Sequence, residues 1–266
     1  MAFARRSVLL IVAGRDPSGA GIDADLAAVK DLKLDARAVE TAKTDQDANE
    51  VRSIGARDAR TWAAEAREAT RSGVAAVKFG LLPGVEHVRA ASDLVRAIRG
   101  GKYTAIPVVV DPVIRASSGG VFLDEAAVAA LRDELVAEKV ILTPNLEEAA
   151  ALARMPASEL VNSALARIEA ARFLLAKGAA AVVITGGHGS EDPVRDLVAR
   201  SGAEPLWIER PRVRGGGIRG SGCRLASRLA GRLAGGMALE KAAADAGDFV
   251  AAEIAKAARV AGRPVR

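Results

Sequence analysis

The chain alternates six short, continuously apolar runs with longer segments that carry Ala, Leu and Arg at helical spacing. A run that is apolar at every position is typical of a parallel strand covered by helices on both faces. Repeated strand–helix units therefore predict an α/β fold, a three-layer αβα sandwich around a central, mostly parallel sheet. The predicted strands are Ser7–Ala13, Ala36–Thr41, Ala75–Phe79, Pro107–Asp111, Val140–Leu142 and Ala181–Thr185. The predicted helices are Ile22–Leu32, Arg57–Arg71, Glu86–Arg99, Glu125–Glu138, Glu147–Ala153 and Ser158–Ala176.

The C-terminal part of the chain follows a different pattern. Two β-rich runs, Val194–Ala199 and Pro205–Glu209, predict an antiparallel pair joined by a short turn. Two helices, at about Ser221–Ala234 and Ala238–Ala258, then close the chain. Because no repeat, low-complexity linker or Pro/Ser-rich boundary interrupts the sequence, we predict a single domain over residues 1–266.

Composition and charge exclude several classes of function. The net charge of +5 is mild for 266 residues, no basic run stands out and aromatic residues make up 3%, so we predict no nucleic-acid partner. The one cysteine excludes an internal disulfide and a cysteine-based zinc site. No stretch reaches the roughly 18 apolar residues of a membrane span, and the run Val8–Ala13 is too short for a signal peptide. We therefore predict a cytoplasmic protein without a membrane partner.

Glycines cluster in the first loop that follows a predicted strand. Ligands in open α/β sheets bind at the carboxyl ends of the strands, so this position matters. The segment Ala13–Asp25 holds Gly14, Gly19 and Gly21 ahead of a predicted helix. Glycines let the backbone approach a ligand, and a helix start offers N–H groups to an anion. Alternatively, a tight strand-to-helix turn needs these glycines for itself.

Acidic residues follow two further predicted strands. Asp111 ends one strand, where a carboxylate can hold Mg²⁺ or orient phosphates; alternatively, it caps the following turn. Asn145 begins a helix as its N-cap, and Glu148 three residues later completes a capping box. The spacing alone favours this capping role for Glu148. The functional alternative places Glu148 near a hydrated Mg²⁺.

A glycine-rich segment, Gly215–Cys223, opens a predicted helix. Free backbone N–H groups at a helix N-terminus form a preorganised anion hole. At this position we expect Cys223 to have a lowered pKa and to act as a base or nucleophile. The alternative is a glycine-rich turn with a buried, inert thiol. His188 either borders a nucleotide site or is an ordinary loop histidine, and His87 lies on a helix predicted to be exposed.

In their order, these motifs resemble those of the hydroxymethylpyrimidine/phosphomethylpyrimidine kinases of thiamin biosynthesis, within the ribokinase-like superfamily. The resemblance spans roughly residues 7–255. The matching segments, each with its family pattern, are Ala13–Asp25 (AGxDPSGGAGIQAD), Thr41–Asp47 (TALTAQNT), Val77–Leu82 (VKIGML), Asp111–Gly119 (DPVMxxxSG), Thr143–Ala149 (TPNLxEA) and Gly220–Cys223 (GTGC).

The resemblance implies a ribokinase-like fold, usually in a homodimer. It implies transfer of the γ-phosphoryl group of ATP to a hydroxymethyl group, and then to the resulting phosphate monoester. Cys223 would take the hydroxyl proton while the amides of the Gly220–Cys223 turn hold the transferring charge. The residues implied in this turn are Gly220, Ser221, Gly222 and Cys223. The pyrimidine would lie near Asp25, Gln46, Gly21 and Ala20. ATP would lie near Asn145, Thr185, Gly187 and Arg219, with Mg²⁺ at Asp111 and Glu148.

The chain departs from the family pattern at several of these positions. Thr185 stands where the family pattern VKGGH has a lysine near the ATP phosphates, and Arg219 replaces the histidine of NTHGTGC. Lys43, Asp45 and Asp47 replace other residues around the glutamine. The arginines that could supply the missing charge are Arg15, Arg115, Arg219 and Arg224.

We therefore predict Mg²⁺/ATP-dependent phosphorylation of 4-amino-5-hydroxymethyl-2-methylpyrimidine, of its monophosphate, or of both. Pyridoxal or pyridoxine kinase is an alternative, because that ring also bears a hydroxymethyl group. The departures motivate a third hypothesis, a catalytically silent paralogue that binds a heterocycle or its phosphate without phosphoryl transfer.

Overall fold

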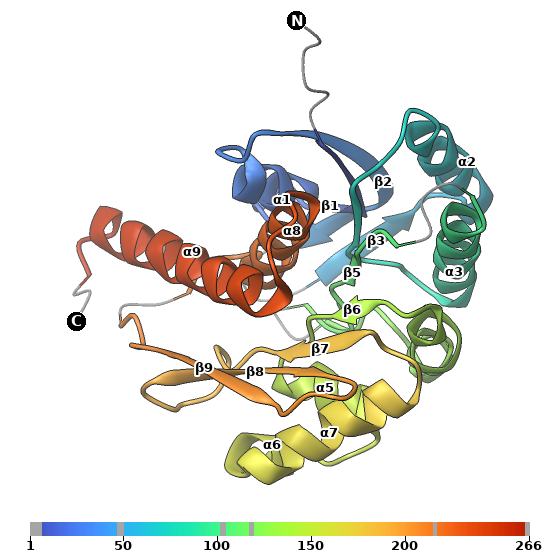
Figure 1. Cartoon of the computed structure of the whole chain (residues 1–266). Coiled ribbons are helices and arrows are strands. Elements are labelled where there is room, and N and C mark those ends of the chain that lie inside the picture. The colour runs from blue at the N-terminus through green and yellow to red at the C-terminus, as the bar shows by residue number, and fades with distance from the viewer. Residues whose placement is uncertain (1–6, 47–50, 102–104, 117–119, 215–216, 264–266) are drawn as a thin grey trace, which may run out of the picture.

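A nine-strand sheet forms the centre of the computed structural model, which describes residues 7–46, 51–101, 105–116, 120–214 and 217–263 (Figure 1). The strands are β1 (Ser7–Arg15), β2 (Leu34–Gln46), β3 (Val51–Ala56), β4 (Ala76–Phe79), β5 (Val108–Val110), β6 (Ile141–Leu142), β7 (Ala181–Ile184), β8 (Val194–Arg200) and β9 (Leu206–Arg210). Their order across the sheet is β3-β2-β1-β4-β5-β6-β7-β8-β9. The strands β1, β2 and β4 to β7 run parallel, whereas β3, β8 and β9 pair antiparallel with their neighbours. The predicted α/β fold is confirmed.

Helices cover both faces of this sheet (Figure 1). One face carries α1 (Ile22–Val29), α8 (Ser221–Ala234) and α9 (Leu239–Val260). The other carries α2 (Ala59–Thr70), α3 (Val85–Arg99), α4 (Glu125–Ala130), α5 (Leu146–Ala153), α6 (Ala157–Asn162) and α7 (Ala164–Ala176). Among the residues that the structure describes, none of the helices combines the length and the apolar character that crossing a membrane requires.

The first strand shows why the apolar runs are continuous. Leu10 and Val12 of β1 belong to the core under α2 and α3, whereas Leu9 and Ile11 belong to the core under α1 and α8. All four side chains are fully buried. Burial of each such side chain contributes about 1.5–3 kcal/mol. The strand therefore needs apolar residues at odd and even positions alike.

The helix predicted at Ile22–Leu32 ends at Val29, and two other predicted elements differ more from the structure. The strand predicted at Ala36–Thr41 continues to Gln46, because its second half pairs with β3, which was not predicted. Polar residues in this half, such as Lys43 and Asp45, conceal it in the sequence. The helix predicted at Ser158–Ala176 is divided into α6 and α7. The side chain of Ser163 accepts the N–H of Ala166 at 3.2 Å and caps α7 there.

A further helix prediction, Glu125–Glu138, combines several helical forms. The segment begins as α4 and continues as a π-helical turn, η1 (Leu131–Leu135), and a 3₁₀ turn, η2 (Val136–Glu138). His87 on α3 is buried, so its predicted exposure is wrong. It stacks on Trp62 with ring centroids 6.2 Å apart, and its Nε2 lies 2.9 Å from the carbonyl oxygen of Arg57. These contacts give His87 a packing role between α2 and α3.

Candidate active site

Two glycine-bearing loops meet at the carboxyl edge of the parallel strands. Gly21 ends the loop after β1 with φ of 61°, and a Cβ there would lie 2.1 Å from the carbonyl oxygen of Gly14. Gly220 begins α8 with φ of 69°, and a Cβ there would lie 2.9 Å from the Cα of Ala20. Glycine at 21 therefore lets the first loop fold back on itself, and glycine at 220 lets that loop pack directly against the N-terminus of α8.

A buried ion pair lies beneath these loops. Nζ of Lys78, near the end of β4, donates to both carboxylate oxygens of Asp25, at 2.8 and 2.9 Å, and both side chains are 0% exposed. Ser227 on α8 donates its hydroxyl to Asp25 at 2.8 Å. Burial disfavours the charge on Lys78, but Asp25, Cys223 and Asp111 outweigh this effect and raise its pKa. Lys78 is thus a fixed cation under the site.

Asp111 and Cys223 meet where α8 begins. A Cβ on Gly222 would lie 3.7 Å from Oδ1 of Asp111, so this carboxylate faces the first turn of the helix. A hydrogen bond from the side chain of Cys223 favours the charged form of Asp111. Burial nevertheless raises the pKa of Asp111 to about 6, although the charge of Lys78 opposes the shift. A thiol, a carboxylate and a helix N-terminus therefore converge at one point.

The pKa of Cys223 is raised, so the prediction of a lowered value is wrong. Burial raises it most; Lys78 opposes the shift, and the carboxylates of Asp111 and Asp25 add to it. The sequence shows the helix N-terminus, which lowers a thiol pKa, but not the two carboxylates that the fold brings close. The thiol needs added positive charge nearby to ionise near neutral pH.

The predicted capping box is present at the start of α5. Asn145 accepts the N–H of Glu148 through Oδ1, and Glu148 accepts the N–H of Asn145 through Oε2, each at 2.9 Å. Thr185 forms a parallel bridge with Asn145 across the sheet edge. Burial and then the negative charge of Asp111 raise the pKa of Glu148 well above its usual value. The cap therefore holds Glu148 close enough to Asp111 for the two carboxylates to repel.

This pair of carboxylates fits a hydrated divalent cation. Mg²⁺ usually keeps several waters and binds through one or two carboxylates plus substrate phosphates. Asp111 and Glu148 are both buried, and a cation between them would relieve their repulsion. Within the described ranges, no group of three or more His, Cys, Asp or Glu side chains is placed to hold a metal. Phosphates and water would therefore have to complete the coordination.

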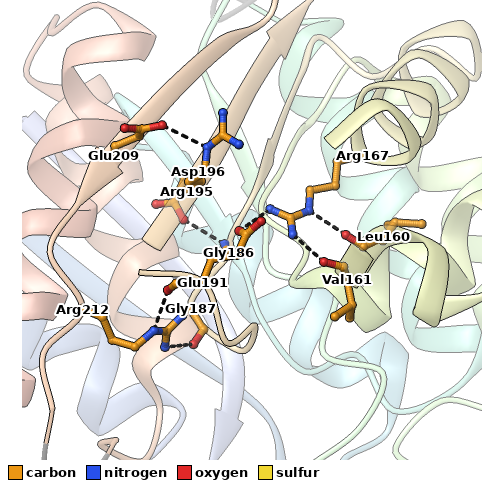
Figure 2. Close-up of polar contacts among 10 residues, drawn as sticks. All are labelled: Leu160, Val161, Arg167, Gly186, Gly187, Glu191, Arg195, Asp196, Glu209 and Arg212. Carbon is orange, nitrogen blue, oxygen red and sulfur yellow. Dashed lines mark hydrogen bonds and ion pairs between the residues drawn. The ribbon is translucent and has the colours of Figure 1, made fainter. Parts of the chain in front are cut away.

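The loop after β7 lies beside Asn145 and Thr185. Gly186 approaches β8 so closely that a Cβ would lie 2.2 Å from the carbonyl oxygen of Arg195. Its N–H donates to Oδ1 of Asp196 at 2.9 Å (Figure 2). Gly187 is exposed, and a Cβ there would meet nothing within 4 Å. The backbone at Gly187 is therefore open to a ligand.

The arginines that were predicted to supply the missing lysine charge occupy different places. Nη2 of Arg219 lies 3.5 Å from Oδ2 of Asp16 in the first loop. Arg15 pairs with acidic side chains of β2 and α1. Arg224 donates to the carbonyl oxygen of Arg219 at 2.7 Å, and Arg115 is exposed. Arg219 thus links the first loop to the start of α8.

Comparisons with known proteins agree with this geometry. The profile of a family described as Phosphomethylpyrimidine kinase matches residues 16–264. The chain belongs to this family. The hydroxymethylpyrimidine/phosphomethylpyrimidine kinase of Streptomyces coelicolor is 33% identical over 249 residues, which cover 93% of this chain and 88% of that relative. The Escherichia coli protein of the same description is 34% identical over 227 residues, 84% of this chain and 81% of that relative.

Solved structures extend the comparison to the fold. The pyridoxal kinase of Staphylococcus aureus in complex with ADP aligns with a TM-score of 0.81 and 26% identity, over 94% of this chain and 89% of that chain. The Bacillus subtilis pyridoxal kinase, also an ADP complex, aligns with a TM-score of 0.79 and 27% identity, over 92% and 90%. The predicted ribokinase-like fold is therefore confirmed for this member of the phosphomethylpyrimidine kinase family.

The predicted site residues largely gather at one sheet edge. The predicted residues near the first loop and the start of α8 are Ala20, Gly21, Asp25, Arg219, Gly220, Ser221, Gly222 and Cys223. Those near the starts of α5 and of the loop after β7 are Asn145, Glu148, Thr185 and Gly187, with Asp111 between the two groups. Gln46 pairs with Val51 through its backbone, and its side chain lies outside the described part of the structure.

Lys78 is the site residue that sequence reasoning missed. The signal was present, because a lysine inside the apolar run Ala75–Phe79 must find a buried partner or destabilise the strand. The sequence does not show which carboxylate that partner is. The fold supplies Asp25, from a helix start that lies 53 positions earlier in the chain.

Proposed function

We propose that this chain transfers the γ-phosphoryl group of ATP, with Mg²⁺, to 4-amino-5-hydroxymethyl-2-methylpyrimidine, to its monophosphate, or to both. The observation that carries the proposal is the meeting of Cys223 and Asp111 at the N-terminus of α8, above the buried Lys78. Relatives that are hydroxymethylpyrimidine/phosphomethylpyrimidine kinases, 33% and 34% identical over most of the chain, support it.

The start of α8 supplies donors for the transferring charge. N–H groups in the first turn of a helix have no partner within the helix, and the helix dipole favours negative charge there. The amides of Gly220–Cys223 would therefore donate to the phosphoryl oxygens. As the acceptor oxygen bonds to the γ-phosphorus, the bond to the β–γ bridging oxygen breaks and ADP leaves with its electrons. Cys223 takes the hydroxyl proton.

Asp111 and Glu148 would hold Mg²⁺, which supplies positive charge to the phosphates of ATP. The same charge favours ionisation of Cys223, because the negative charge of Asp111 is one cause of its raised pKa. Asn145, Thr185 and Gly187 would receive the nucleotide along the adjoining edge. The ADP complexes of the aligned pyridoxal kinases support ATP as the donor.

A second candidate function is pyridoxal kinase. The Staphylococcus aureus pyridoxal kinase in complex with pyridoxal aligns with a TM-score of 0.79 at 25% identity over 94% of this chain. Pyridoxal carries a hydroxymethyl group on a nitrogen heterocycle, so the same proton acceptor and anion hole would serve. Binding without phosphoryl transfer is the outcome expected if the departures at Thr185 and Arg219 abolish catalysis.

Product formation distinguishes these functions. Mass spectrometry would detect phosphorylated product after Mg²⁺·ATP is supplied with the pyrimidine alcohol, its monophosphate or pyridoxal, each alone. We expect product from one or both pyrimidines, none with EDTA, and a kcat/KM at least about tenfold above that for pyridoxal. A preference for pyridoxal would establish the second candidate. No product from any acceptor at enzyme concentrations that match substrate would contradict kinase activity on these compounds.

Two further properties stay predictions. The family resemblance predicts a homodimer, which analytical ultracentrifugation measures directly. Composition predicts a cytoplasmic protein, and the family resemblance predicts that its partner is a small heterocyclic alcohol or its phosphate.

A further inference from the structure

The loop between β7 and β8, residues 186–193, lacks the side chains that usually order a segment. Its sequence is Gly-Gly-His-Gly-Ser-Glu-Asp-Pro. Three of these eight residues have no side chain, and Pro193 carries the only apolar side chain of the loop. His188, Ser190 and Asp192 are exposed. Because glycine has the largest conformational freedom to lose and hydrophobic burial is small here, polar contacts must fix this loop.

Three side chains from outside the 186–193 loop form hydrogen bonds to it (Figure 2), and a fourth, the exposed Arg214, lies 4.0 Å from the carboxylate of Asp192. Asp196 accepts the N–H of Gly186 at 2.9 Å. Arg212 donates through Nη1 to the carbonyl oxygen of Gly187 at 3.1 Å and through Nε to that of Glu191 at 2.7 Å. Arg167 donates through Nη1 to the carboxylate of Glu191 at 2.8 Å. The loop is thus held near its start and again at residue 191.

Arg167 is itself rigidly held. Its side chain is 1% exposed, and Nε and Nη2 donate to the carbonyl oxygens of Leu160 and Val161 at 2.6 and 3.0 Å (Figure 2). These carbonyls belong to the last turn of α6, so the guanidinium is fixed before it reaches the loop. Of the groups that Arg167 contacts, the Glu191 carboxylate provides the link to the loop.

Asp196 is fixed in the same way on the opposite side of the loop. It is buried, and its second oxygen pairs with Nη1 of Arg210 at 2.5 Å. Arg210 in turn packs against α9, where a Cβ on Gly247 would lie 2.0 Å from Nη2. The loop therefore receives its contacts from side chains anchored on α7, β8 and the segment after β9.

We propose that Arg212 and Arg167 are positioning residues for the nucleotide: they order the 186–193 loop before ATP binds, so that Gly187 is presented in its bound conformation. The proposal rests on the proposed function and adds residues that contact the loop. A loop ordered in advance loses little conformational entropy on binding, which strengthens affinity. The acceptor half of the site, around Asp25 and Cys223, does not depend on these contacts.

Hydrogen exchange of the ligand-free protein tests the ordering directly. In Arg212→Met and in Arg167→Met, amides in the segment 186–191 should exchange at least about tenfold faster, whereas β1 should not change. Arg172→Met is the matched control, because Arg172 is exposed on the same helix as Arg167. Unchanged exchange in the loop of both folded variants would overturn the proposal.

ADP affinity, measured by calorimetry with Mg²⁺, tests the consequence for binding. The Kd should rise about tenfold in both variants, or about 1.4 kcal/mol, while KM for the acceptor stays within twofold. Wild type that binds ADP no more tightly than the variants would overturn the inference and leave the proposed function intact. Wild type that binds no ADP and forms no product would refute both.

A conservative variant keeps the test valid if a methionine variant fails to fold. Arg212→Lys retains the charge, but one ammonium replaces the two guanidinium nitrogens that reach separate carbonyls. We expect the hydrogen-exchange rate of the loop and the Kd for ADP in Arg212→Lys to lie between the values of the wild type and those of Arg212→Met. Wild-type values for both quantities in this variant would show that a single cation suffices and would overturn the two-point contact.

Discussion

The two halves of the candidate site are ordered by different means. In the first half, the charged side chains of Asp25, Lys78 and Asp111 are buried, and the half-buried Cys223 lies beside them in the first turn of α8. In the 186–193 loop, exposed backbone is held by arginine side chains that reach in from neighbouring elements. One half is a buried charge cluster and the other is a surface loop.

Because the two halves are ordered differently, substitutions in them should affect different quantities, the stability of the fold and the affinity for the nucleotide. A buried charge has lost its hydration, so removal of its partner destabilises the whole protein. Contacts to a surface loop fix a few residues, and their loss changes the conformations of that loop before it changes the fold. Variants of the buried charges should therefore lower the free energy of unfolding, and variants of the arginines that hold the loop should weaken nucleotide binding.

The largest expected effect comes from the buried ion pair. Lys78→Met leaves the Asp25 carboxylate at 0% exposure without its cation, and should lower the free energy of unfolding by about 3–5 kcal/mol. Urea unfolding measures this change. Asp25→Asn/Lys78→Met should be more stable than the sum of the two single changes implies, because no unpaired charge remains.

A surface lysine provides the control. Lys177 pairs with Asp133 at 2.8 Å, and both side chains are 40% exposed. Lys177→Met should lower the free energy of unfolding by about 1 kcal/mol or less. Equal losses for the two lysine variants would contradict the distinction between a buried cluster and an exposed surface.

The next largest effect is a difference between alanine substitutions at the two adjacent glycines, Gly186 and Gly187. Gly186→Ala places a Cβ 2.2 Å from the backbone of β8 and should destabilise the protein by about 1–3 kcal/mol. Gly187→Ala meets nothing within 4 Å, so it should leave the thermal midpoint nearly unchanged and weaken ADP binding severalfold. Calorimetry with and without ADP measures both quantities. A Gly187→Ala protein with wild-type ADP affinity would place the nucleotide elsewhere.

The smallest expected effect is a pH dependence on the surface. Arg132 and Lys177 lower the pKa of Asp133 to about 2. A depressed pKa means that the unfolded chain binds more protons, so this stabilisation is present above about pH 4 and is lost as pH falls toward 2. Because Asp133 is exposed, it amounts to under about 1 kcal/mol. Asp133→Asn should flatten this part of the acid unfolding profile, and an unchanged slope would contradict it.

Most of the fold was predictable because its strands bury both faces. Continuous apolar runs such as Ser7–Ala13 have few alternatives to a central parallel strand. The β2–β3 hairpin was missed because its polar residues resemble a loop, and pairing between strands is not a local property. The break at Ser163 depends on a single cap inside an otherwise continuous helical pattern.

Site residues were predictable where their role depends on the local backbone or on neighbours within a few positions of sequence. The glycines at 21 and 220 and the capping box at Asn145 and Glu148 are of this kind. The raised pKa of Cys223 was not predictable, because it depends on burial and on the carboxylates of Asp111 and Asp25, which come close to the thiol only in the fold. Arg167 and Arg212 escaped notice for the same reason, since each contacts Glu191 across more than twenty positions of sequence.

Single-turnover phosphoryl transfer by Cys223→Ala, with ADP affinity measured on the same protein, tests the division of the site most directly. Loss of the proton acceptor should slow transfer by about 10²–10⁴, while ADP binds within about twofold of wild type. Transfer at the wild-type rate would contradict the assignment of Cys223. If Cys223→Ala lost both ADP binding and phosphoryl transfer, this result would contradict the separation of the buried cluster from the nucleotide loop.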